Sequence, residues 1–129
     1  MSKEYVIRIM PDNLIRLEEL DPAKVLEDFQ RLCGGCIQTV PARLGDRDLI
    51  LAVDEEGKLK DAEVNVLGTF LTMKSLPGDR IAGPAVLCQE GMRDGEPDLA
   101  GFDPEEAADL ADQLVHGFMR FLSTLKTMD

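Results

Sequence analysis

The longest periodic stretch of the sequence lies at residues 103–127, where a helix start signal precedes apolar residues at helical spacing. Asp103 can accept a hydrogen bond from a free backbone N–H group, Pro104 suits the first helical position, and the following glutamates are placed to close a capping box. The apolar face spans about six turns. Its residues are Ala107, Leu110, Ala111, Leu114, Val115, Phe118, Phe121, Leu122 and Leu125. This pattern predicts a long C-terminal helix whose apolar surface exceeds what one small sheet can cover, so that part of it meets a second copy of the chain.

A second helix is predicted at residues 21–33. Asp21 and Pro22 form a start signal of the same kind, and Gly34-Gly35 supplies the left-handed backbone that ends a helix. The residues between them form one apolar stripe, made of Val25, Leu26, Phe29, Leu32 and Cys33. The stripe indicates that this helix packs on the core with one face only.

Four stretches of the chain are predicted as β-strands because they are rich in β-branched, aromatic or aliphatic residues and end at turn residues. They are residues 4–10, residues 36–42, residues 48–54 and residues 80–89. Pro41 favours a sheet edge or a strand end for the second stretch, since proline cannot donate a ladder hydrogen bond. The third stretch is apolar enough for the centre of a sheet, and Gly83-Pro84 interrupts the fourth.

The helices and strands do not alternate strictly, which indicates an α+β fold. We predict a small, mainly antiparallel sheet of about four strands, packed by the helix of the N-terminal half and by the long C-terminal helix. The length of 129 residues suits a single domain. Within it we expect a core at residues 1–88, an acidic loop at residues 89–102 and the helix at residues 103–127. Residues 61–73 fit either a short helix or an irregular apolar segment.

The net charge of −11, from 25 acidic and 14 basic residues, argues against direct binding of nucleic acid, which needs clustered lysine and arginine. Nine of the acids lie between Glu90 and Asp112, where Arg93 is the only basic residue. A solvated loop and helix face explains this block. Mimicry of a nucleic-acid backbone is the alternative explanation.

The sequence contains no segment that approaches the ~20 apolar residues of a membrane helix. The N-terminal residues 1–8 have no long apolar stretch and no small-residue cleavage site. The three cysteines, an odd number, fit a reducing compartment better than a secreted disulfide scaffold. We therefore expect a cytoplasmic protein.

Several short motifs follow one another in a characteristic order within residues 4–88. Gly34-Gly35 ends the first helix, an acidic Glu-Gly-Lys-Leu turn occupies residues 56–59, Asn65 follows, and residues 79–83 read Asp-Arg-Ile-Ala-Gly. Together they resemble the domain of unknown function 3846 family, whose members are small proteins of bacteria, phages and mobile elements. The resemblance implies a compact domain with no established catalytic residues and no known cofactor. The pattern departs at Asp54, where the family commonly has Asn, and the C-terminal helix lies outside it.

Cys33 and Cys36 have the spacing of a redox pair or of two zinc ligands. A redox thiol is activated at a helix N-terminus, whereas this pair follows a helix C-terminus, where the dipole keeps thiols protonated. Cys88 and His116 could complete a zinc site, but a structural site normally brings a second closely spaced pair. We therefore expect packing roles for the cysteines and a boundary position for His116.

The turn at residues 54–58 is the best candidate for a binding site. Asp54, Glu55 and Glu56 could hold a cation or receive a basic surface at a hairpin tip beside Lys58, and Gly57 is expected to adopt a positive φ there. A solvated turn is the competing interpretation. Two further candidates, Asn65 and Asp79, lie among apolar neighbours and so need a partner, which is either the backbone or a ligand.

These observations favour a non-enzymatic binding or accessory protein, of phage or mobile-element origin by the resemblance, that contacts another protein or a small ligand without a cofactor or membrane. The sequence has no Gly-x-Ser-x-Gly motif, no phosphate-binding loop and no basic patch. The alternative is a small enzyme that uses carboxylates for acid–base catalysis in a concave face of the sheet. A third hypothesis is an acidic nucleic-acid mimic that uses residues 90–112. A homodimer through the C-terminal helix is compatible with each of them.

Overall fold

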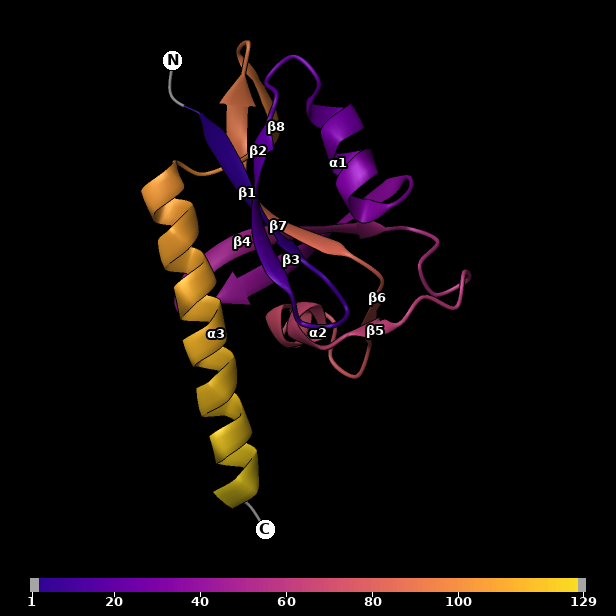
Figure 1. Cartoon of the computed structure of the whole chain (residues 1–129), viewed down its shortest axis with the longest axis vertical. Coiled ribbons are helices and arrows are strands. Elements are labelled where there is room, and N and C mark those ends of the chain that lie inside the picture. Colours follow the sequence, from indigo (N-terminus) through magenta and orange to yellow (C-terminus); the bar gives the residue numbers. More distant parts are fainter. Residues whose placement is uncertain (1–2, 128–129) are drawn as a thin grey trace.

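The computed structural model describes residues 3–127 and is built around an antiparallel sheet (Figure 1). The helices are α1 (Val25–Cys33), α2 (Val66–Thr72) and α3 (Pro104–Thr127). The strands are β1 (Glu4–Ile9), β2 (Ile15–Leu20), β3 (Ile37–Leu44), β4 (Arg47–Asp54), β5 (Val64–Asn65), β6 (Ile81–Ala82), β7 (Ala85–Arg93) and β8 (Glu96–Ala100). The main sheet has the order β2-β1-β7-β4-β3, with β8 paired to β7, and β5 pairs with β6 separately. The predicted α+β class is confirmed, with more strands than the four expected.

Both faces of the main sheet are covered by helices. Val6 of β1 and Val86 of β7 lie in the cluster under α1, whereas Ile7 and Leu87, one residue further along each strand, lie in the cluster under α2 and α3. Successive side chains of a strand point to opposite faces, so a strand covered on both faces has no polar side and reads as a continuous apolar run. This explains the composition of β4. Pro41 lies in the edge strand β3, as predicted.

Helix α1 begins three residues later than its sequence signal predicts. Its N-cap is Lys24, which makes no side-chain capping bond. Asp21 instead accepts a hydrogen bond from the N–H of Ala23 at 2.9 Å, which closes a tight turn before the helix. The predicted end of the helix is confirmed, because Gly34 has a left-handed backbone with φ of 87°.

The acidic loop predicted at residues 89–102 is wrong, because most of this segment belongs to a β-hairpin formed by β7 and β8. Asp94 and Gly95 occupy its two-residue turn with positive φ values of 52° and 80°. Asp-Gly between extended segments is a strong signal for such a turn. The prediction failed because this hairpin is mainly exposed, so its strands are rich in charged residues and resemble a loop.

The start of helix α3 is joined to the first strand. The N–H of Tyr5 donates to the carbonyl of Phe102 at 2.8 Å, and the N–H of Phe102 donates back to Tyr5 at 2.7 Å. Asp103 accepts from the N–H of Glu106 at 2.8 Å, which confirms the predicted cap, while the Glu106 carboxylate contacts Arg47 at 3.3 Å. From this anchored start, α3 runs along the sheet, and its last turns extend past α2 (Figure 1).

Gly101 should be required for this anchoring. A Cβ atom on Gly101 would lie 2.6 Å from the carbonyl oxygen of Tyr5, so the Gly101→Ala substitution must push two backbone segments apart. We expect it to lower the free energy of unfolding by about 2 kcal/mol in urea denaturation. Gly117→Ala within α3 is the matched control, because a Cβ there would meet nothing closer than 3.9 Å. It should be neutral or stabilise by up to about 1 kcal/mol, and equal losses in the two variants would contradict this account.

Candidate functional site

The predicted binding turn follows the end of β4, and its first carboxylate is already occupied. The side chain of Asp54 is buried, accepts a hydrogen bond from Lys60 Nζ at 2.7 Å and another from the N–H of Glu56 at 2.9 Å. The hydrogen bond from Lys60 lowers the pKa of Asp54, against the opposing effect of burial. Asp54 therefore holds its own loop in place, and the segment is not the hairpin tip that the sequence predicted.

A second ion pair closes the same loop. Lys58 Nζ donates to the carboxylate of Asp79, which also accepts from the N–H of Arg80 at 2.8 Å. The hydrogen bond from Lys58 lowers the pKa of Asp79. The two candidate residues are thus each other's partner, in an exposed setting where such a pair contributes little to stability.

Gly57 is needed for a different reason from the one predicted. Its backbone φ is not positive, contrary to the expectation from the turn. A Cβ atom at this position would lie 2.6 Å from the carbonyl oxygen of Ala82. The glycine therefore permits the loop to pack closely on β6.

These side chains surround a small hollow of about 250 Å³. It brings together four of the six predicted binding residues, Asp54, Glu55, Lys58 and Asp79, whereas Glu56 and Asn65 are not part of it. The rest of the lining is Gln38, Val40, Val53, Leu76, Arg80, Ile81 and Ala82. Among the charged residues of this lining, Lys58 and Asp79 form an ion pair with each other, and Asp54 forms one with Lys60.

Asn65 is a structural residue rather than an exposed ligand-binding one. It is fully buried and forms the N-cap of α2, where its side-chain oxygen accepts from the N–H of Gly68 at 2.9 Å. Its amide group donates to the carbonyl of Ile9 at 2.8 Å and to that of Gly83 at 2.9 Å. The backbone thus provides the partner that the sequence required for this polar residue.

The cysteines and the histidine do not converge. Cys33, the last residue of α1, and Cys88 of β7 are buried in the cluster between α1 and the sheet, and burial raises the pKa of each thiol to about 12. Cys36 is exposed, and His116 lies on the outer surface of α3 beside Asp112. Within residues 3–127 there is no group of three or more His, Cys, Asp or Glu side chains placed to hold a metal. A thiol with so high a pKa is also a poor redox nucleophile at neutral pH.

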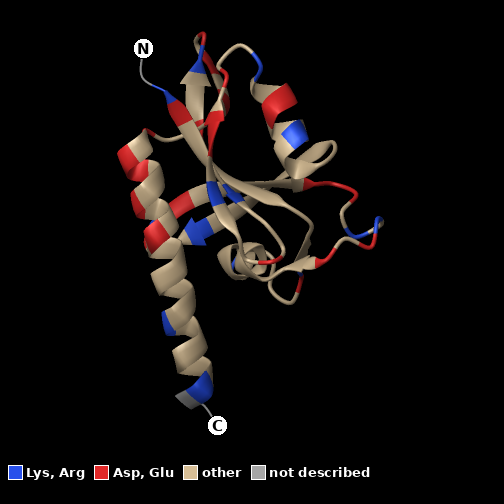
Figure 2. Cartoon of the chain, in the orientation of Figure 1, with Lys and Arg blue, Asp and Glu red and all other residues tan. Residues whose placement is uncertain are grey.

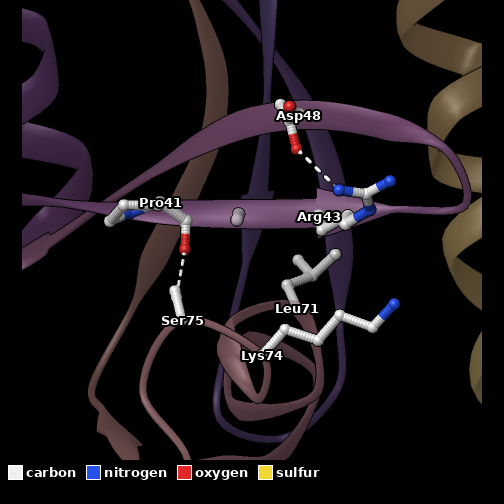
Figure 3. A pocket seen from close by; sticks show the side chains of 7 residues that line it. Pro41, Arg43, Asp48, Leu71, Lys74 and Ser75 are labelled. Carbon is white, nitrogen blue, oxygen red and sulfur yellow. Dashed lines mark hydrogen bonds and ion pairs between the residues drawn. The ribbon is translucent and has the colours of Figure 1, made fainter.

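Another hollow, of about 230 Å³, lies between the β3–β4 hairpin and the end of α2 (Figure 3). Leu71 forms part of its apolar wall, and Arg43 and Lys74 lie at its rim. Asp48 contacts Arg43 at 3.2 Å, and the hydroxyl of Ser75 donates to the carbonyl of Pro41 at 2.6 Å. The serine hydroxyl thus donates to a backbone carbonyl rather than to a basic side chain. Sequence reasoning missed this hollow because residues from three separate segments form it.

The distal half of α3 (residues 115–126) carries the largest group of exposed apolar side chains on one helix. The exposed fractions are 45% for Val115, 57% for Met119, 37% for Leu122 and 47% for Leu125. Phe118 and Phe121 anchor the other side of this segment, with ring centroids 5.4 and 5.3 Å from that of Phe70. The apolar surplus expected from the sequence is therefore present, beyond the part of α3 that the sheet covers.

Acidic residues gather on the β7–β8 hairpin and on the first half of α3 (Figure 2). Some of them have internal partners, since Asp98 contacts Arg93 at 3.3 Å. The idea that residues 90–112 mimic a nucleic acid stays a prediction.

Among the described helices, none is long and apolar enough to cross a membrane.

Comparison with known proteins identifies a family and a fold. The model of the family described as "Domain of unknown function (DUF3846)" matches residues 1–115, a wider range than residues 4–88, and includes the first half of α3. No curated protein matches the chain. A solved structure, "Crystal structure of small RNA methyltransferase HEN1", matches with a TM-score of 0.57 at 13% identity. The match covers 91% of this chain and 16% of that one, so the similarity extends to the fold of a small part of the larger protein.

Replacement of Asn65 should destabilise the whole fold. Asn65→Ala removes the hydrogen bonds of the side chain with two backbone carbonyls and one N–H group, and we expect a loss of about 3 kcal/mol in the free energy of unfolding. Gln38→Ala is the control, because that side chain is exposed and should change the value by no more than about 0.5 kcal/mol. Urea denaturation measures both variants. A stable Asn65→Ala protein would show that the buried amide does not join these segments.

The ion pair of Asp54 should make stability depend on pH. Because its pKa is lowered in the folded state, the contribution is complete above the unfolded pKa of about 4 and is lost as the pH falls through the lowered value. The difference in unfolding free energy between wild type and Asp54→Asn should therefore shrink from about pH 6 to about pH 3. Glu55→Gln, at an exposed side chain without an ion pair among the described residues, should show no such change. A difference for Asp54→Asn that stays constant with pH would refute the pairing.

Proposed function

Because this chain belongs to the DUF3846 family, whose description states no activity, we propose a function from its surface: a non-enzymatic binding protein that contacts another protein through the distal half of α3. The observation that carries the proposal is the row of exposed apolar side chains at Val115, Met119, Leu122 and Leu125. From the resemblance, the proposal includes a bacterial, phage or mobile-element origin, and the odd number of cysteines favours a cytoplasmic location.

The spacing of these four residues favours a binding surface over scattered exposure. They follow one another at intervals of four, three and three residues, which places neighbours on adjacent turns of the helix. Single exposed apolar residues are normal in proteins, but a contiguous group marks an interaction site. Helices that bind in the grooves of partner proteins use apolar side chains with this spacing as their main contacts.

The electrostatics of the loop around Asp54 and Asp79 argue against acid catalysis there. A general acid at neutral pH needs a carboxyl group with a raised pKa. The pKa values of Asp54 and Asp79 are shifted the other way by their lysine partners. Both groups are therefore held as carboxylates within ion pairs, which suits a structural role.

The proposal is tested by site-specific photo-crosslinking in cells that naturally carry the gene. A photoreactive amino acid at Met119 should form a covalent adduct with a partner, because its side chain lies at the middle of the exposed row. The same amino acid at Gln113, exposed on the other side of α3, is the control and should form little adduct. Adding Leu122→Glu to the Met119 probe should abolish the adduct without changing the thermal unfolding. Absence of an adduct at Met119, or equal adducts at both positions, would refute the proposal.

A further inference from the structure

We propose that the distal half of α3 binds a second copy of this chain, with the two α3 helices antiparallel and a two-fold axis passing beside Met119. This inference rests on the proposed function, since it names the partner of the same surface. Three features of α3 carry it: the spacing of its apolar residues, the placement of its charges and the extension of the helix past α2.

The apolar residues of α3 contain a coiled-coil pattern beside the face that packs on the sheet. Positions separated alternately by three and four residues are occupied by Ala108, Ala111, Val115, Phe118, Leu122 and Leu125. This is the spacing at which two helices pack side by side. Val115 and Leu122 are exposed at the centre of the pattern, and Phe118 is only partly buried against Phe70. Ala111 and Phe118 thus pack on the core along one side of this seam, while Val115, Leu122 and Leu125 remain exposed to a partner helix.

The charges that flank this seam select the antiparallel orientation. Asp112 lies seven residues before Met119 and Lys126 lies seven residues after it, so all three are on one line along the helix. A two-fold axis beside Met119 brings Asp112 of each copy opposite Lys126 of the other. A parallel arrangement would instead place Asp112 against Asp112 and Lys126 against Lys126. The same asymmetry is visible along the whole of α3, acidic in its first half and basic near its end (Figure 2).

Both charged groups are accessible for such contacts. The Asp112 side chain is 70% exposed, and its contact within the chain is with the exposed His116 at 3.4 Å. Lys126 is exposed, and its ammonium group has no hydrogen bond or ion pair within residues 3–127.

In the antiparallel register Val115 of one copy meets Leu125 of the other, and Leu122 meets Phe118. Leu125, which continues the core-facing side of α3 past Phe121, would then be covered.

The shape of the molecule permits this arrangement. The sheet covers the first half of α3, while the last turns extend past α2 (Figure 1). In an antiparallel pair the two sheets therefore lie at opposite ends of the paired helices. The contact at residues 112–126 is about 21 Å long at the helical rise. A contact of this length should give a dimer that dissociates on dilution.

The test is a charge exchange followed by sedimentation equilibrium at low salt, from ~1 μM to ~1 mM protein. Wild type should dimerise over this range. Asp112→Lys and Lys126→Asp, each alone, create two like-charged contacts per dimer and should raise the dissociation constant about tenfold or more. The double variant D112K/K126D exchanges the two charges and should return it to within about threefold of wild type. Gln113→Lys, which places a lysine on the other side of the helix, should have no effect.

The outcomes separate this inference from the proposed function. A protein that stays monomeric throughout the range, or a dimer in which the double variant fails to recover, would overturn the second copy as partner. A crosslink from Met119 to a different protein would also overturn it, while leaving the proposed binding surface in place. A crosslinked product of twice the chain mass, together with the recovery in the double variant, would establish it.

Discussion

Strand β7 lies between β1 and β4, and the rest of the structure depends on this pairing. It joins the start of the chain to its middle, and its residues alternate between the two clusters that fill the two faces of the sheet. The end of the same strand turns back through β8, which leads the chain to β1 again at the Tyr5–Phe102 bridge. The direction in which α3 leaves the sheet is therefore a consequence of where β7 is placed. The exposed distal half of α3 exists because that direction carries the helix past α2.

Electrostatic and apolar features have different roles in this molecule. The ion pair of Lys60 joins the loop at residues 55–62 to Asp54 at the end of β4, and that of Lys58 joins the same loop to Asp79, just before β6. Acidic groups elsewhere find arginine partners in the same way, as Glu4 does with Arg93. Four apolar side chains of the distal half of α3, by contrast, remain exposed: Val115, Met119, Leu122 and Leu125. Exposed apolar side chains are therefore a better guide to a binding surface than charged groups that already form ion pairs within the chain.

The difference between prediction and structure is clearest at particular residues. Asn65 and Asp79 were equally good candidates in the sequence, since both are polar residues among apolar ones. One is a buried cap with three backbone partners, and the other is an exposed member of an ion pair. The Asp94-Gly95 pair is itself a signal for a hairpin turn, but the charged residues around it favoured the prediction of a loop. The hollow beside Ser75 had no local signal, because Arg43, Leu71 and Ser75 meet only through the packing of α2 on β3.

Local chemistry in the sequence was sufficient to place most elements. The Asp103 cap and the Gly34 helix end depend on hydrogen bonds or sterics within a few residues. Pro41 indicates an edge strand because it has no N–H donor, and the apolar run of β4 indicates a strand covered on both faces. The helical spacing of the apolar residues was also sufficient to predict that α3 has more apolar surface than one small sheet can cover. Which part of α3 is covered, and which stays exposed, could not be read in this way. That depends on long-range strand pairing, because the sheet and α2 must be assembled before any residue of α3 is either inside or beyond them.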